Sequence, residues 1–127
     1  MTDREMLELA ARAAGIRTPS PDDMDPGGRQ YEESLGLWCK FKWGWNWWNP
    51  LADDGDALRL AVKLDIEIYQ GDDEGPAVCA GYWGKPERRD VARLYCIEPL
   101  ADDPYAATRR AIVHTAAEIG RQMEETT

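Results

Sequence analysis

The sequence has no excess of basic residues and little of the chemistry that binds metal ions. Its 127 residues include 15 lysines and arginines against 24 aspartates and glutamates, for a formal net charge of −9. Nucleic-acid phosphates and anionic membranes are bound by basic surfaces, so this charge argues against direct DNA binding and against membrane docking. The single histidine and the three cysteines show no C-x-x-C or C-x-x-H spacing, which excludes the usual zinc sites.

Long apolar runs and targeting signals are also missing. No window approaches the roughly 20 apolar residues of a membrane-spanning helix. The first residues show no basic stretch followed by an apolar run. We therefore expect a cytoplasmic protein. Cys39, Cys79 and Cys96 are odd in number and widely spaced, so we expect them to be small buried thiols in a reducing compartment.

Catalytic signatures are absent as well. The sequence contains no G-x-S-x-G, P-loop, G-x-G-x-x-G or H-E-x-x-H pattern. The acidic turns Asp22–Asp25 and Asp72–Glu74 lack the regular ligand spacing of a calcium loop, so no metal is expected there. We expect a protein that is not an enzyme and uses no cofactor. An enzyme acting on nucleotides would need a carboxylate or His114, which we expect on an exposed helix face, as its acid–base group.

What is present indicates one globular domain over residues 1–127. Hydrophobic residues make up 43% and charged residues 31%, which is too apolar for a disordered chain. Residues 17–34 are rich in proline, glycine and aspartate, and they predict a long loop. Helix patterns cover residues 2–14, from Asp53 or Asp54 to about Leu64, and 103–120. Strand patterns cover residues 35–47, 65–70, 77–83 and 91–98.

Apolar spacing predicts which side chains of the helices face the core. In the second helix we expect Leu58, Val62 and Ala61 to face inward. In the last helix we expect an inward stripe that begins at Tyr105, and we expect Gly120 to end the helix. The inward stripe of the last helix comprises Tyr105, Ile112, Val113, Ala116 and Ile119.

Tryptophan dominates the first strand pattern. Residues 35–47 alternate with period two, and their length predicts a hairpin, bulge or bend, with Gly44 as its place. Trp43, Trp45 and Trp47 share one parity and are expected to be core. Trp38 and Trp48 fall on the other parity, where they could line an open aromatic patch. An exposed tryptophan face would favour a homodimer, because large apolar patches are rarely left in water.

The element order predicts an α+β fold. Three helices are enough to cover both faces of a sheet, so we expect a three-layer α/β/α sandwich with a mainly antiparallel sheet of about four strands. Three blocks also resemble the phage ABA sandwich domain family of small bacteriophage and prophage proteins. The blocks are MTDREMLELAARAAGI, WNPLADDGDALRLAVKLDIEI and DPYAATRRAIVHTAAEIG. The resemblance implies the same helix–sheet–helix layering and a phage or prophage origin, and the family supplies no established activity.

Arginines on two predicted helices are the strongest binding candidates. Arg59 lies on the second helix together with Lys63, and Arg109 and Arg110 lie in the last one. Guanidinium groups grip phosphate or carboxylate through paired hydrogen bonds, although nearby acidic runs could simply pair with them. Together with tryptophan and tyrosine they define a candidate ligand-binding set. This set comprises Trp38, Trp48, Arg59, Tyr105, Arg109 and Arg110.

Two functions fit these observations. The first is a non-enzymatic binding protein that sequesters a small anionic or nucleotide-like ligand, such as an immune signal of the host bacterium, as a phage counter-defence. Aromatic rings would stack on a base and arginines would hold phosphate. The second is an acidic protein–protein inhibitor that mimics nucleic acid and occupies the basic groove of a host defence complex.

Overall fold

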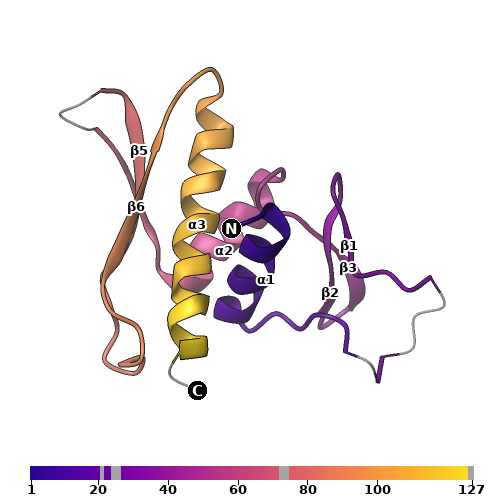
Figure 1. The fold of residues 1–127 in the computed structure, drawn as a ribbon. Coiled ribbons are helices and arrows are strands. Elements are labelled where there is room, and N and C mark those ends of the chain that lie inside the picture. The colour runs from indigo at the N-terminus through magenta and orange to yellow at the C-terminus, as the bar shows by residue number, and fades with distance from the viewer. Residues whose placement is uncertain (21, 24–26, 72–74, 126–127) are drawn as a thin grey trace.

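The computed structural model describes residues 1–20, 22–23, 27–71 and 75–125. Within those ranges the chain forms, in order, α1 (Asp3–Ala14), β1 (Tyr31–Glu32), β2 (Gly36–Phe41), β3 (Gly44–Trp48), α2 (Asp54–Leu64), β4 (Glu67–Gln70), β5 (Ala77–Tyr82), β6 (Leu94–Pro99) and α3 (Pro104–Glu125). The helices lie between two groups of strands (Figure 1).

The described residues form two antiparallel three-stranded sheets, ordered β1-β2-β3 and β4-β5-β6. Helix α3 covers β5 and β6, α1 packs along α3, and α1 also contacts β2. The α+β class is confirmed, but the expected single sheet of about four strands between helical layers is not what these residues form. The strand predicted over residues 35–47 folds back on itself and pairs locally. It therefore lies on the opposite side of the helices from β4, β5 and β6 (Figure 1).

The helix starts follow from their caps. The Thr2 hydroxyl accepts a hydrogen bond from the Glu5 amide at 3.1 Å, which confirms the predicted start of the first helix. The Asp53 carboxylate accepts from the Asp56 amide at 2.7 Å and starts α2. Helix α2 ends at Asp65, which takes the left-handed conformation with φ 53°.

Gly120 does not end the last helix, which continues to Glu125. It lies where α3 crosses α1, and a Cβ built on it would come within 2.0 Å of the Leu9 carbonyl oxygen. Buried alanines surround this crossing, among them Ala10 and Ala116. The glycine is therefore needed for close helix contact, whereas sequence pattern alone cannot separate that role from a helix stop.

Three predicted inward positions are wrong, two on α2 and one on α3. Leu58 and Val62 are 60% and 69% exposed, and Tyr105 is 71% exposed. The face of α2 that packs inward consists of Ala57, Leu60, Ala61 and Leu64. This face is itself an apolar stripe with i, i+3, i+4, i+7 spacing, and it confirms the inward position of Ala61. Its alanines allow α2 to approach α3 closely.

The tryptophan-rich segment forms the predicted hairpin, with Phe41 paired to Gly44 across the turn at Lys42 and Trp43. In a hairpin the residues that pair directly share a face. A two-residue turn therefore reverses the parity, so that odd positions face inward in β2 and even positions face inward in β3. Trp48 is consequently buried at 3% exposure, whereas Trp43 is 70% exposed, the reverse of the prediction for each.

The outer face of the hairpin carries its own aromatic cluster, which comprises Trp38, Trp45 and Trp47. The Trp38 ring stacks with Trp45 at a centroid distance of 6.4 Å and meets Trp47 edge to face at 5.0 Å. Arg29, from the predicted 17–34 loop, lies over Trp38 with 4.0 Å between its guanidinium carbon and the ring centroid. The loop contains β1 and is thereby held against the hairpin. Asp25 and Asp72–Glu74, which belong to the predicted acidic turns, lie outside the described residues.

Candidate ligand-binding cleft

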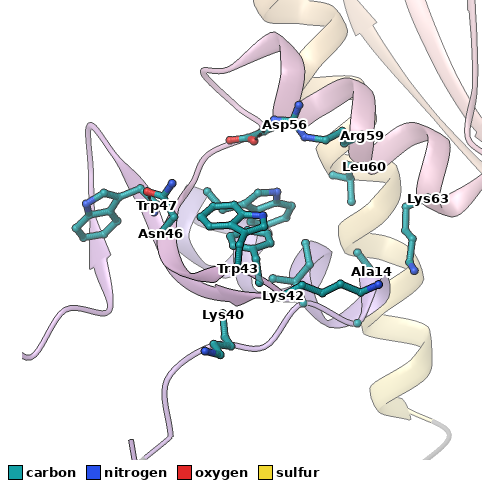
Figure 2. Close-up of a pocket in the computed structure, with 14 residues that line it drawn as sticks. Ala14, Lys40, Lys42, Trp43, Asn46, Trp47, Asp56, Arg59, Leu60 and Lys63 are labelled. Carbon is teal, nitrogen blue, oxygen red and sulfur yellow. Dashed lines mark hydrogen bonds and ion pairs between the residues drawn. The ribbon is translucent and has the colours of Figure 1, made fainter. Parts of the chain in front are cut away.

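A cleft of about 800 Å³ opens between the inner face of the hairpin, the carboxyl end of α1 and one face of α2 (Figure 2). Its size lies in the range typical of small-molecule sites. The residues that line it are Ala14, Gly15, Ile16, Lys40, Phe41, Lys42, Trp43, Asn46, Trp47, Trp48, Asp56, Arg59, Leu60 and Lys63. We refer to this feature below as the hairpin cleft.

Aromatic rings form one wall of the hairpin cleft. The hairpin turn places Trp43 at the tip, where its indole stacks on Phe41 with centroids 5.1 Å apart and planes 8° apart. Trp48 belongs to the buried core as well as to the cleft lining. The exposed Trp43 ring is therefore a rigid, accessible surface on which a planar group can stack.

Lysines and an arginine supply the charge. Lys42 comes from the hairpin turn, while Arg59 and Lys63 are one turn apart on α2. Lys40 borders the cleft, but its side chain lies on the outer face of the hairpin and points away from the cleft in Figure 2. In Figure 2 the Lys42 and Lys63 side chains both extend towards Ala14. Among the described residues, no carboxylate lies within ion-pair distance of these three lysines. Lys85, the remaining lysine of the chain, forms an ion pair with Asp65.

Asp56 is the one carboxylate that lines the hairpin cleft, as far as the chain is described. It accepts hydrogen bonds from the Asn49 amide at 3.0 Å and from Arg59 at 2.7 Å, and its side chain is only 18% exposed. Its charge is therefore engaged with the loop before α2 and with Arg59. The lysines remain as uncompensated positive charge in a protein whose net charge is −9.

The buried thiol of Cys39 is not a nucleophile of this site. Burial, reinforced by the negative charge of Asp56, raises the pKa of the Cys39 thiol to about 12. A thiol with that pKa stays protonated at neutral pH, and only the thiolate is reactive. All three cysteines are buried and free, as expected from the sequence.

The structure brings together only part of the predicted ligand-binding set. Trp48 and Arg59 line the hairpin cleft, whereas Trp38 lies on the outer face of the hairpin. Tyr105 stands exposed at the start of α3. Neither Tyr105 nor Trp38 belongs to the cleft lining.

Arg109 and Arg110 are used within the fold. The Arg109 Nε donates to the Leu51 carbonyl at 2.9 Å, and an Nη donates to Asp54 at 2.7 Å. Arg110 contacts Asp3 at 3.4 Å. These contacts match the alternative that nearby acidic residues pair with the arginines. His114 lies 3.6 Å from Glu98 on the side of α3 that faces β6.

The sequence pattern did not indicate Lys40, Lys42 and Trp43 as site residues, and Lys63, the basic neighbour of Arg59, was outside the predicted ligand-binding set. The signal was present in the segment KFKWGW, because a hairpin turn at Lys42 and Trp43 places both side chains at an exposed tip. Recognising it required the turn position, which fixes the parity of every residue in the strand pair.

Comparison with known proteins finds no relative of this chain. No family model matches the chain. No curated protein and no solved structure matches it either. Among the described residues no cluster of three or more metal-ligating side chains occurs, and no helix there is both long and apolar enough to span a membrane.

Proposed function

We propose that the chain is a non-enzymatic binding protein whose hairpin cleft takes a small anionic, nucleotide-like ligand. The observation that carries this proposal is the meeting of the accessible Trp43 ring with Lys42 and Lys63, which have no carboxylate partner among the described residues, in a strongly acidic protein. A ligand with a planar ring and a phosphate group complements both features, because a base stacks on indole and phosphate attracts ammonium groups.

The charge pattern supports a small ligand rather than a nucleic-acid strand. Three of the four lysines line the cleft, whereas other cations such as Arg4 and Arg121 are paired with neighbouring glutamates elsewhere on the surface. Extended binding to a polynucleotide requires a basic track that follows the backbone. A local basic cleft within an acidic surface instead favours a compact anion.

The biological role that we propose rests on the resemblance to the phage ABA sandwich domain family. A phage or prophage protein in the cytoplasm of its bacterial host could sequester a nucleotide immune signal and so act in counter-defence. This role needs affinity and no turnover, which agrees with a protonated Cys39 and with the absence of catalytic motifs from the sequence.

The acidic-mimic alternative receives less support. A nucleic-acid mimic presents a continuous surface of unpaired carboxylates. Here several acidic residues are paired with arginines, including Asp54 with Arg109 and Asp56 with Arg59. Capture of one basic host protein, in a salt-sensitive manner, would be the evidence that revives this alternative.

Isothermal titration with a panel of cyclic, linear and ADP-ribose-type nucleotides tests the proposal. We expect at least one nucleotide to bind, and we expect Trp43→Ala and the double variant Lys42→Ala/Lys63→Ala each to weaken binding by roughly tenfold or more. Binding should also weaken as salt rises, because lysine–phosphate attraction is screened.

Matched controls separate the cleft from general surface effects. Tyr105→Ala removes a ring of almost equal exposure, 71% against 70% for Trp43, outside the cleft. Arg89→Ala removes an exposed cation outside the cleft lining. Neither control should change nucleotide affinity. A panel in which no nucleotide binds, or in which the controls weaken binding as much as the cleft variants, refutes the proposal.

A further inference from the structure

A second, smaller pocket adjoins the hairpin cleft. It has a volume of about 350 Å³ and lies where the carboxyl ends of α1 and α2 meet β5 and the turn that follows it. Its lining consists of Ala13, Ala14, Gly15, Lys63, Leu64, Tyr82, Lys85, Glu87, Arg88 and Ile119. Ala14, Gly15 and Lys63 line both spaces, so the two are neighbours that share one lysine.

The Tyr82 hydroxyl is the unusual group of this second pocket. The residue is 2% exposed, and its hydroxyl is buried without a hydrogen-bond partner among the described residues. A buried hydroxyl normally has a hydrogen-bond partner, since a buried polar group without a hydrogen bond costs free energy. Burial raises the pKa of Tyr82, while Arg88 and Lys85 act in the opposite direction, which agrees with these lining cations lying near the hydroxyl.

The charges around the Tyr82 hydroxyl indicate which kind of group would complement this pocket. Lys85 is engaged by Asp65, and Arg88 is only loosely held by Asp90 at 3.9 Å. Lys63 has no carboxylate partner in the described part of the chain. The groups that remain uncommitted are therefore donors, and their complement is an acceptor that carries negative charge.

Two features oppose an anion at this place, and the cations must outweigh them. Glu87 carries a negative charge, and helix carboxyl ends carry a partial one. Carbonyls of the last turn of α1 are already hydrogen-bonded, since the Ile16 amide donates to the Ala11 carbonyl oxygen at 2.9 Å and the Gly15 amide donates to that of Arg12 at 3.1 Å. In α2 the Ile66 amide donates to Ala61 in the same way, also at 2.9 Å. The helix ends therefore offer few free acceptors that would compete for the lysine and arginine.

We propose that the second pocket is an oxyanion subsite, in which the Tyr82 hydroxyl donates a hydrogen bond to a phosphate-sized group held between Lys63 and Arg88. Because Lys63 also lines the hairpin cleft, the ligand would carry two anionic groups, one in each space. This deepens, and rests on, the nucleotide-binding function proposed above. It narrows the ligand class to nucleotides with two separated phosphates, such as a nucleoside 3′,5′-bisphosphate or a dinucleotide.

The test compares Tyr82→Phe with the matched control Tyr105→Phe, which removes a hydroxyl far from both pockets. Thermal unfolding without ligand comes first. We expect Tyr82→Phe to melt at the same temperature as the wild type or higher, because the lost hydroxyl has no partner in the folded chain. A lower melting temperature would show that the hydroxyl is already satisfied, and it would overturn the subsite.

Isothermal titration with inorganic phosphate and pyrophosphate comes second. We expect the wild type and Tyr105→Phe to bind pyrophosphate, and Tyr82→Phe to bind it roughly tenfold to a hundredfold more weakly, as befits one lost hydrogen bond to a charged group. Arg88→Gln should weaken binding similarly. Equal affinity of Tyr82→Phe and wild type for both anions overturns the subsite.

A nucleotide comparison separates failure of the subsite from failure of the proposed function. The wild type should prefer a nucleoside 3′,5′-bisphosphate to the 5′-monophosphate, and Tyr82→Phe should lose that preference while keeping the monophosphate. Monophosphate binding that depends on Trp43 but shows no bisphosphate preference refutes the subsite alone. Pyrophosphate binding that depends on Tyr82, with no nucleotide bound, supports the subsite as an oxyanion site and refutes the nucleotide function.

Discussion

Gly120 of α3 crosses α1 directly over the Leu9 carbonyl, with no room for a Cβ atom between them. Gly120→Ala should therefore destabilise the protein by about 3 kcal/mol or more, because two helix backbones must move apart. Gly55→Ala is the matched control. Gly55 also lies in a helix, but a Cβ there meets only the flexible ends of Arg59 and Asp53 at 3.2 Å. It should change the free energy of unfolding by at most about 1 kcal/mol, measured by urea unfolding, because only side-chain ends have to shift.

The two tryptophans of the hairpin cleft should respond differently to truncation. Trp48 is core, so Trp48→Ala should cost about 3–5 kcal/mol. Trp43 is exposed apart from its stack on Phe41, so Trp43→Ala should cost at most about 1 kcal/mol. Denaturant unfolding of the two variants measures this difference. Equal losses would mean that Trp43 is structural and that its variant is unsuitable for binding tests.

Arg109 should be a residue of stability rather than of ligand binding. Its side chain is 17% exposed and joins α3 to the loop before α2 through Leu51 and to the start of α2 through Asp54. Arg109→Ala should reduce the free energy of unfolding by about 1–3 kcal/mol and leave nucleotide affinity unchanged. Arg110→Ala, which loses only an exposed contact to Asp3, should change stability by at most about 1 kcal/mol. A large affinity loss in Arg109→Ala with normal stability would contradict this assignment.

Alkaline pH should weaken the fold through Cys39. The pKa of its thiol is raised from 9.0 to about 12, so the unfolded chain loses this proton at lower pH than the folded chain does. The contribution of this pKa difference to the free energy of unfolding is complete below pH 9 and is lost as the pH rises towards 12. The free energy of unfolding should fall over that window less steeply in Cys39→Ala than in the wild type. Parallel curves would show that Cys39 does not contribute.

Much of the secondary structure could be predicted from local signals. Thr2 with Glu5 and Asp53 mark helix starts through side-chain hydrogen bonds to nearby amides, and such contacts depend only on neighbours in the sequence. The length of the alternating run over residues 35–47 predicts a hairpin, bulge or bend near Gly44, which is also a local signal. These features need no knowledge of the rest of the fold.

Features set by packing between distant segments could not be predicted in this way. The parity of the tryptophans depends on which two residues form the turn, and Gly120 depends on α1 crossing it. The sequence predicts Arg109 as a ligand-binding residue, yet the fold brings Asp54 to it from a distant position in the chain. Lys42 is a candidate only because the hairpin and α2 face one another across the cleft, which also joins it to Lys63.

Indole NMR signals provide the most direct test of the hairpin cleft as the binding site. The six tryptophans report from distinct places, with Trp43 at the cleft and Trp83 far along the other sheet, donating to Glu67 at 2.6 Å. During titration with a nucleotide bisphosphate, we expect the Trp43 indole N–H signal to shift and saturate while the Trp83 signal stays in place. Saturating shifts at Trp83 with none at Trp43, or no shift at any indole, would contradict it.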